Sequence, residues 1–288
     1  MAIIQPYHTK PNFDPLGKST FSQSFLGVEL ELESRIREDK ILEELAQKTI
    51  NELGDFVVLK QDASLSFGFE ICSRPASLDT HKEKWSNFFA NVAPNMVTSF
   101  IRSSDLKKID SCGMHIHINR DPLSDLQIGK ILSFVHEPTN YNFIKTIAGR
   151  DSNQYCKYAE RRGFKDAKPE YYTKNPRSSG VNLHNNNTIE IRIFKATTDF
   201  YIFLKNLEFA HSLVKFTAPG LMSVKDVIQY KKFIEFVNVN KKIYPNLFKF
   251  MSSENSNMFR MKMEPMPPLP NFNFNPFGYT NNYVNVNI

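Results

Sequence analysis

Residues Cys112 to Asn119 read CGMHIHIN, with two histidines separated by one residue. Successive side chains of a β-strand point to opposite faces, so His115 and His117 would share one face while Met114 and Ile116 occupy the other. The alternation therefore predicts a strand that buries an apolar side and presents two imidazoles on its second side. Taken alone, such imidazoles are as consistent with a surface or a simple hydrogen-bonding role as with a functional site.

Three further segments alternate in the same way. In FLGVELELES, Glu29 and Glu31 share one face of the predicted strand. In FGFEICS, Glu70 and Cys72 share one face, and in NTIEIRIF, Glu190 and Arg192 do so. Glu29 and Glu31 by themselves are typical of the solvated side of an edge strand, and a surface Glu–Arg pair contributes only about 0–1 kcal/mol. The pattern gains weight because it recurs on every strong strand of the chain.

If these strands share one sheet, their polar faces converge. Two carboxylates about 4 Å apart repel each other by about 1 kcal/mol in water and by about 4 kcal/mol at an effective dielectric constant near 20. Several carboxylates gathered together must therefore become protonated or bind a cation. Carboxylates with few imidazoles favour a hard ion such as Mg²⁺ or Mn²⁺, and Mg²⁺ in such sites commonly works with phosphates. The sequence thus predicts a metal site that binds a nucleotide.

The whole chain of 288 residues has the composition of a folded protein, with 41% hydrophobic and 23% charged residues. No segment approaches the roughly 20 apolar residues of a membrane span, and the N-terminus lacks the layout of a secretory signal. Three cysteines without C-x-x-C spacing indicate reduced thiols. We therefore expect a cytoplasmic protein that does not bind membranes. The net charge of +6 suits polyanions or a phosphate pocket, and nucleic acid is not an expected partner.

Helical periodicity predicts helices over residues 39–53, 77–92, 124–136 and 200–216, and a capping box at Ser223 and Asp226 predicts another to about Val237. The first eighteen residues resemble an arm, and residues 150–187 form a long basic loop of the kind that tends to be functional. From Ser252 the chain is rich in Pro, Met and Asn, a composition typical of disorder or of a segment that adds a strand to a partner.

Five motifs occur in the order and spacing of the amidoligase family, which is related to glutamine synthetase and glutamate-cysteine ligase. They span about Gly27 to Phe216 and read GVELELE, DASLSFGFEICS, CGMHIHI, GRDSNQYC and RSSGVNLHNNNTIEIRIFKAT. The resemblance implies an α+β, glutamine-synthetase-like fold, in which an antiparallel sheet forms a catalytic cleft and helices pack on its outer side. It also implies a catalytic domain over residues 18–218 and a helical extension with an Asn- and aromatic-rich tail over residues 219–288.

The same resemblance implies an ATP- and magnesium-dependent carboxylate-amine ligase that forms an amide bond through an acyl phosphate. Two Mg²⁺ ions, with Mn²⁺ as an alternative, would be held by Glu29, Glu31, Glu70, His115 and Glu190. His117, Arg150, Arg177 and Arg192 would serve the phosphates or the substrate carboxylate, and of these His117, Arg150 and Arg192 would be catalytic.

The sequence departs from the family pattern at two places. The turn that usually reads Asp-Gly-Ser is Asp62-Ala63-Ser64 here, and Ser178 replaces the aromatic residue that often follows the loop arginine. Neither change removes an expected ligand.

The substrates would be a carboxylate and an amine from an amino acid, a peptide or a protein side chain, and a homo-oligomer is compatible with the family. Relatives occur in phage and prophage settings, where the location would be the host cytoplasm. The alternative function is that of a catalytically inactive family member that acts as a binding or virion-associated structural protein.

Overall fold

The computed structural model describes residues 3–9, 13–16, 24–101, 108–109, 112–174, 176–221 and 223–253. The predicted tail, apart from Ser252 and Ser253, lies outside the described residues. The strands are β1 (Ile4–Gln5), β2 (Leu26–Ser34), β3 (Val57–Lys60), β4 (Gly68–Ser73), β5 (Met96–Val97), β6 (Phe100–Ile101), β7 (Lys108–Ile109), β8 (Gly113–Asn119), β9 (Val181–Asn182) and β10 (Thr188–Lys195).

Helices alternate with the strands along the chain. They are α1 (Asp39–Leu53), α2 (Leu78–Lys84), α3 (Ser86–Asn91), α4 (Asp125–Val135), α5 (Tyr141–Ala148), α6 (Phe200–Phe216), α7 (Val224–Val227), α8 (Tyr230–Val239) and α9 (Pro245–Ser252). Short 3-10 segments are η1 (Gly54–Phe56), η2 (Ala93–Asn95), η3 (Pro138–Asn140), η4 (Phe164–Ala167) and η5 (Pro169–Tyr171).

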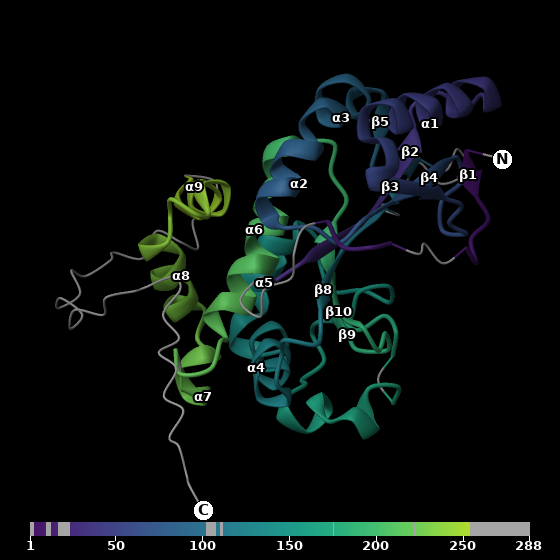
Figure 1. Ribbon diagram of the computed structural model, residues 1–288. Coiled ribbons are helices and arrows are strands. Elements are labelled where there is room, and N and C mark those ends of the chain that lie inside the picture. Colours follow the sequence, from purple (N-terminus) through teal and green to yellow (C-terminus); the bar gives the residue numbers. More distant parts are fainter. Residues whose placement is uncertain are drawn as a thin grey trace, which may run out of the picture.

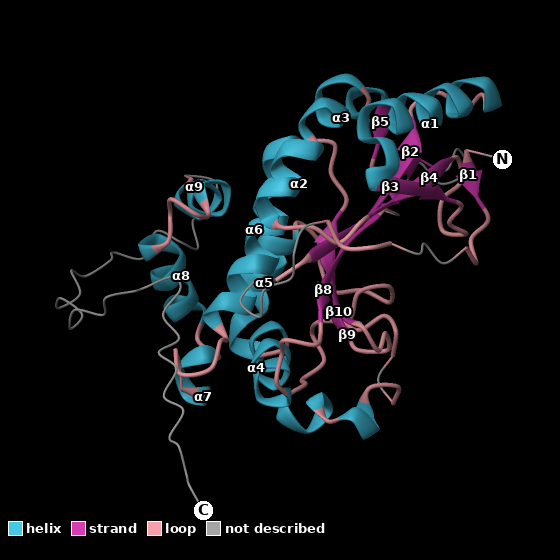
Figure 2. Ribbon diagram, in the orientation of Figure 1, coloured by secondary structure: helices cyan, strands magenta, loops and turns pink. Residues whose placement is uncertain are grey.

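Eight of the described strands form one open sheet, in the order β1-β3-β4-β2-β8-β10-β9, with β5 also paired to β2. The pairs are antiparallel except that β1 runs parallel to β3, where Ile4 faces Leu59. The four strands predicted to share a sheet are β2, β4, β8 and β10, and they lie side by side in the order β4-β2-β8-β10 (Figure 2). The architecture is thus a mixed α/β fold with a mostly antiparallel sheet.

One face of the sheet packs against helices. Val28, Leu30 and Leu32 of β2 are buried there, as the alternating pattern predicts. Helix α6 covers this face, because the amide of Asn206 donates to the sulfur of Met114 at 3.4 Å. Figure 1 shows α2 beside α6 on this side of the strands, while the segment after α5 runs on the other side. The charged residues of β2 consequently face away from the helices.

A β-bulge changes the alternation in β10. Glu190 and Ile191 pair with His117 and Ile116, but the register shifts before Phe194, which pairs with Met114. The shift places Phe194 on the helix side, where its ring lies 5.8 Å from that of Phe209. A bulge leaves backbone groups outside the strand ladder. Here the carbonyls of Arg192 and Ile193 accept hydrogen bonds from the side chain of Arg150, which lies outside the sheet.

The capping signal at Ser124 predicted a helix start correctly, whereas two segments predicted as single helices are each divided in the structure. The hydroxyl of Ser124 accepts from the Gln127 amide at 3.2 Å and opens α4. The segment predicted as one helix over 77–92 is divided at Trp85 into α2 and α3. The helix predicted from Ser223 to Val237 is also divided, into α7 and α8.

The division between α7 and α8 has a clear physical cause. The buried amide of Asn140 donates to the carbonyl of Ile228 at 2.9 Å and accepts from the backbone amide of Tyr230 at 3.2 Å. These contacts take the place of helical hydrogen bonds. Farther along, the ring of Phe233 packs 5.3 Å from Phe209 of α6, so α8 shares the core of the sheet domain. The boundary at residue 218 stays a prediction.

Across the described part of the chain, every helix is too short or too polar to traverse a lipid bilayer.

Candidate functional site

The registers of three strand pairs bring the predicted polar residues together. Glu29 of β2 faces His115 of β8 directly, and Glu31 faces Glu70 of β4. Glu190 of β10 faces His117, the next residue on the same side of β8. The pairing of distant strands therefore builds one group, which we call the carboxylate-imidazole cluster; its members are Glu29, Glu31, Glu70, His115, His117 and Glu190.

His115 lies at the centre of this cluster. Its Nδ1 atom lies 3.2 Å from Oε2 of Glu29 and 3.5 Å from Oε1 of Glu190. Its Nε2 atom lies 3.8 Å from Oε1 of Glu31. Glu31 is fixed in turn by the backbone amide of Gly113, which donates to Oε2 at 2.5 Å. Both edges of the imidazole therefore contact carboxylates of other strands.

His117 has a different environment on its two ring nitrogens. Nδ1 lies 3.0 Å from the hydroxyl of Thr188, a contact that fixes the ring orientation. Nε2 is buried and forms an ion pair with Oε1 of Glu29 at 3.2 Å. The side chains of His117 and Glu29 are 19% and 28% exposed, so the cluster meets solvent at this end.

Two further residues hold the outer carboxylates. Lys60 forms an ion pair with Oε2 of Glu70 at 3.1 Å, and the thiol of Cys72 donates to the same oxygen at 3.3 Å. The amide of Asn182 donates to Oε2 of Glu190 at 2.6 Å. Sequence reasoning did not identify Lys60 or Asn182. The alternation of VVLK places Lys60 opposite the apolar face and was a usable signal, whereas Asn182 belongs to the two-residue strand β9, which is too short to show a period.

The pKa values of the cluster show how strongly its charges interact. Burial works against the charge of Glu29, but the two histidines, His117 foremost, outweigh it and hold the pKa well below its usual value. Burial, followed by the charge of Glu29, raises the pKa of Glu70 to about 7. Burial lowers the pKa of His117, but the charge of Glu29 dominates and raises it to about 9. Without a metal ion, protons on His117 and Glu70 therefore offset part of the negative charge.

The donor atoms fit divalent cations. Glu29, His117 and Glu190 offer ligand atoms within 4.8 Å of one another, and a second group of Glu31, Glu70 and His115 does the same. The two groups have no residue in common. Around a magnesium ion with ligands at about 2.1 Å, neighbouring ligands lie about 3 Å apart, which matches the 3.2 Å between His117 Nε2 and Glu29 Oε1.

Oxygen and nitrogen donors fit this site better than the thiol does. Cys72 also lies within reach, in a group with Glu29 and Glu70. Burial raises the pKa of its thiol above the usual value, so it remains protonated and donates its hydrogen bond to Glu70. The arrangement therefore suits a hard oxygen-binding ion such as Mg²⁺ or Mn²⁺.

The three predicted arginines occupy different positions. Nη1 of Arg192 forms an ion pair with Oε1 of Glu190, and its Nε is buried without a hydrogen-bond partner. Arg150 donates to the carbonyls of Ile193 at 3.0 Å and of Arg192 at 2.6 Å, which are carbonyls at the bulge. Arg177 is exposed on the long loop. Arg192 alone of the three makes a direct ion pair with a cluster residue.

Comparisons with known proteins add little to this geometry. No protein-family model matches the chain, and no curated protein matches it. Among solved structures, a chain in the complex between the prokaryotic ubiquitin-like protein Pup and its ligase PafA is a distant structural neighbour. The two chains share 10% sequence identity at a TM-score of 0.37, over 81% of this chain and 59% of that one. This likeness is too weak to carry an argument about the site.

The fold and the site together define a class: a mixed α/β protein whose open, mostly antiparallel sheet carries a largely buried carboxylate-imidazole cluster suited to divalent cations.

Proposed function

We propose that this protein is an ATP- and magnesium-dependent carboxylate-amine ligase. The observation that carries the proposal is the pair of separate donor groups, Glu29-His117-Glu190 and Glu31-Glu70-His115, side by side on antiparallel strands. Two neighbouring divalent sites are a recurrent arrangement in phosphoryl transfer. The motifs shared with the amidoligase family point to the same reaction, in which ATP activates a carboxylate.

The cluster residues would divide between the two ions. His117 resembles a phosphate ligand by its motif, but its place in one donor group with Glu29 and Glu190 makes it a candidate metal ligand. Its contact to Thr188 is the kind of second hydrogen bond that orients ligating histidines. When bound, the ions would neutralise charge on the β- and γ-phosphates of ATP.

The reaction itself would proceed in two steps. An oxygen of the substrate carboxylate attacks the γ-phosphorus, which forms an acyl phosphate and releases ADP. The amine then attacks the acyl carbon, the amide bond forms, and phosphate leaves with the bonding electrons while the amine loses a proton. The unpartnered Nε of Arg192 is a donor for the transferring phosphoryl oxygens.

The long loop would protect the acyl phosphate from water. It begins at Arg150, and its end is fixed to the sheet because the amide of Arg192 donates to the carbonyl of Gly180 at 2.9 Å. Arg177 lies on this loop, and a substrate carboxylate is its proposed partner. The loop also carries the basic residues Lys157, Arg161, Arg162, Lys165, Lys168 and Lys174.

The test is the release of ADP from ATP in the presence of Mg²⁺ and a mixture of amino acids. We expect Glu29→Gln and Glu190→Gln to lower the rate by at least about 100-fold, since each removes a charged ligand. Glu33→Gln is the matched control: it lies on the same strand and side, but its Oε1 accepts from the Ser66 amide at 3.0 Å, outside the cluster. Its activity should stay near that of the wild type.

Binding of Mn²⁺ without any ADP release from a wide panel of carboxylates and amines would contradict the ligase proposal and identify a non-catalytic binding protein. Equal loss of activity in Glu33→Gln would show that the effect comes from folding, and circular dichroism of each variant separates these outcomes.

A further inference from the structure

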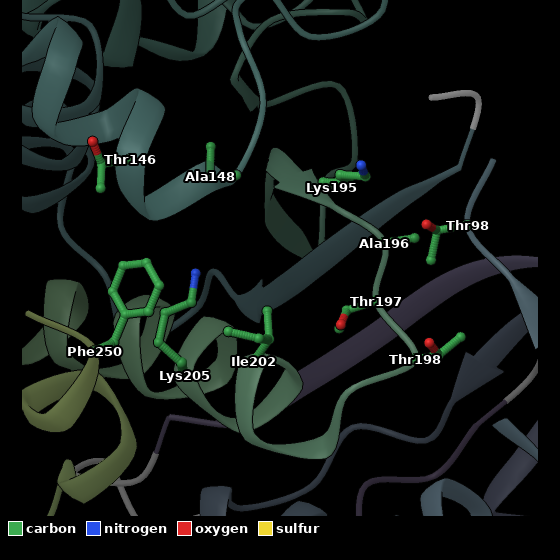
Figure 3. A pocket seen from close by; sticks show the side chains of 11 residues that line it. Thr98, Thr146, Ala148, Lys195, Ala196, Thr197, Thr198, Ile202, Lys205 and Phe250 are labelled. Carbon is green, nitrogen blue, oxygen red and sulfur yellow. The ribbon is translucent and has the colours of Figure 1, made fainter. Parts of the chain in front are cut away.

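A second site lies apart from the cluster, where the end of β10 meets α5, α6 and α9. A pocket of about 280 Å³ opens there (Figure 3). Its walls combine hydroxyl groups with apolar side chains, and they include Thr98, Thr146, Thr197, Thr198, Ile202 and Phe250. None of its lining residues belongs to the carboxylate-imidazole cluster. Among the residues that the structure describes, no acidic residue lines the pocket.

Lys205 of α6 lies at this pocket with its side chain buried, at 2% exposure. Its Nζ donates to the carbonyl of Ile147 and lies 4.7 Å from the ring centroid of Phe250. Figure 3 shows the amine beside Phe250, directed toward the end of α5 that carries Ala148. Within the described residues no carboxylate pairs with it, and burial alone lowers its pKa to about 7.

A buried ammonium without a counter-charge is unfavourable, and the cost is removed when an anion pairs with it. One hydrogen bond to Ile147 leaves Nζ with further donors. Lys195, at the end of β10, also lines the pocket, but the proposal rests on Lys205 alone. The Phe250 ring and the Ile202 side chain supply an apolar surface, on which a fully hydrated inorganic ion gains nothing.

We propose that this pocket binds a small organic carboxylate, whose anionic group pairs with Lys205 and whose hydrocarbon part lies against Phe250 and Ile202. The carboxylate fits better than inorganic phosphate because its hydrocarbon part gains contact with Phe250 and Ile202, which inorganic phosphate cannot make. The inference does not depend on the ligase proposal, since it concerns binding and uses none of the cluster residues.

Calorimetric titration of the full chain with sodium butyrate tests the proposal, with inorganic phosphate as the comparison anion. We expect saturable binding of one butyrate, a loss of at least tenfold in affinity in Lys205→Met, and a weaker loss in Phe250→Ala. Lys249→Met is the matched control, because Lys249 neighbours Phe250 on α9 but is exposed and does not line the pocket. Its affinity should stay within twofold of the wild type.

Proton uptake gives a second readout that does not depend on the folding of a variant. Butyrate binding at pH 7 should draw a proton onto the partly neutral Lys205, and this appears as a dependence of the binding heat on the ionisation heat of the buffer. Among the described lining residues the other titratable group is Lys195, and Lys195→Met should keep the uptake.

Three results would overturn the proposal: no saturable butyrate binding, unchanged binding in Lys205→Met, or phosphate binding as tight as butyrate with no effect of Phe250→Ala. The last result would identify a site for inorganic anions instead.

Discussion

Nδ1 of His115 lies 3.2 Å from Oε2 of Glu29, and the two residues face each other directly across β8 and β2. The other ring nitrogen, Nε2, lies 3.8 Å from Glu31. One imidazole thus separates two carboxylates that their own strand places on the same face. Small displacements of this ring should therefore change ion binding more than they change stability.

Gly113→Ala tests the position of the ring without altering any ligand. A Cβ atom at residue 113 would lie 3.0 Å from Nε2 of His115 and 3.4 Å from Oε2 of Glu31, so the ring has to shift. We expect the affinity for Mn²⁺ to fall about tenfold, which corresponds to about 1.4 kcal/mol. Titration calorimetry measures the affinity.

Gly27→Ala is the matched control for this change. Gly27 faces His117 across the neighbouring strand, and its Cβ would meet the His117 Cβ at an ordinary 3.5 Å. Mn²⁺ affinity should stay within about threefold of the wild type, that is, within about 0.7 kcal/mol. If both alanines weaken binding equally, the ring of His115 does not have the special position assigned to it.

Glu70→Gln should have opposite effects with and without metal. The pKa of Glu70 is raised to about 7, so the folded state releases this proton at a higher pH than the unfolded chain, whose carboxyl titrates near 4.5. The destabilisation develops between these pH values and is complete above pH 7. At pH 8 in EDTA, the neutral variant should therefore be more stable by about 1–3 kcal/mol in urea unfolding.

Addition of Mn²⁺ should reverse this order. The wild type gains stability in proportion to its occupancy, whereas the variant lacks one charged ligand and gains less. A variant that is less stable than the wild type in EDTA would contradict the charge balance described for the cluster.

The acid sensitivity of the fold should depend partly on His81. The Nε2 atom of this buried histidine lies 2.6 Å from the carbonyl oxygen of Leu26. Its Nδ1 atom accepts a hydrogen bond from the Trp85 indole at 3.1 Å. Burial is the main cause that lowers the pKa of His81 to about 4. The unfolded chain therefore binds a proton at this residue near pH 6.5, whereas the folded state binds it only near pH 4. Stability therefore falls as the pH decreases from about 6.5 to about 4.

The measurable consequence is a smaller pH dependence in His81→Gln, whose amide can still donate to Leu26. Between pH 7 and pH 4, the free energy of unfolding should fall by about 3 kcal/mol less in the variant than in the wild type. His136 and His211 have lowered pKa values for the same reason and keep part of the slope. The exposed His8→Gln should behave as the wild type, and an unchanged slope in His81→Gln would contradict this assignment.

Gly68→Ala should destabilise the sheet strongly. A Cβ at this position of β4 would lie 2.1 Å from the carbonyl oxygen of Leu32 and 2.7 Å from the Cα of Glu33, and these backbone atoms belong to the paired strand. Since they cannot move without breaking the pair, we expect a loss of about 3 kcal/mol in urea unfolding. Gly163→Ala, with its nearest contact at an ordinary 3.4 Å to Ser133, serves as the control and should cost less than about 1 kcal/mol.

The sequence determined which residues would share a face. Period-2 alternation assigned Glu29 and Glu31 to one side of β2 and His115 and His117 to one side of β8, because the side chains of a strand alternate regardless of its neighbours. The capping signals likewise located the start of α4 at Ser124. These features depend on residues close together in the chain.

Tertiary structure alone decided the strand order, the register and the bulge in β10. Register determines that Glu29 meets His115, and it follows from how the apolar faces pack together, which a single strand does not encode. The same holds for Lys60 and Asn182, whose contacts to Glu70 and Glu190 arise from strand pairing, and for Asn140, whose amide divides α7 from α8. Local periodicity sets the side a residue faces, and long-range packing sets the partner it meets there.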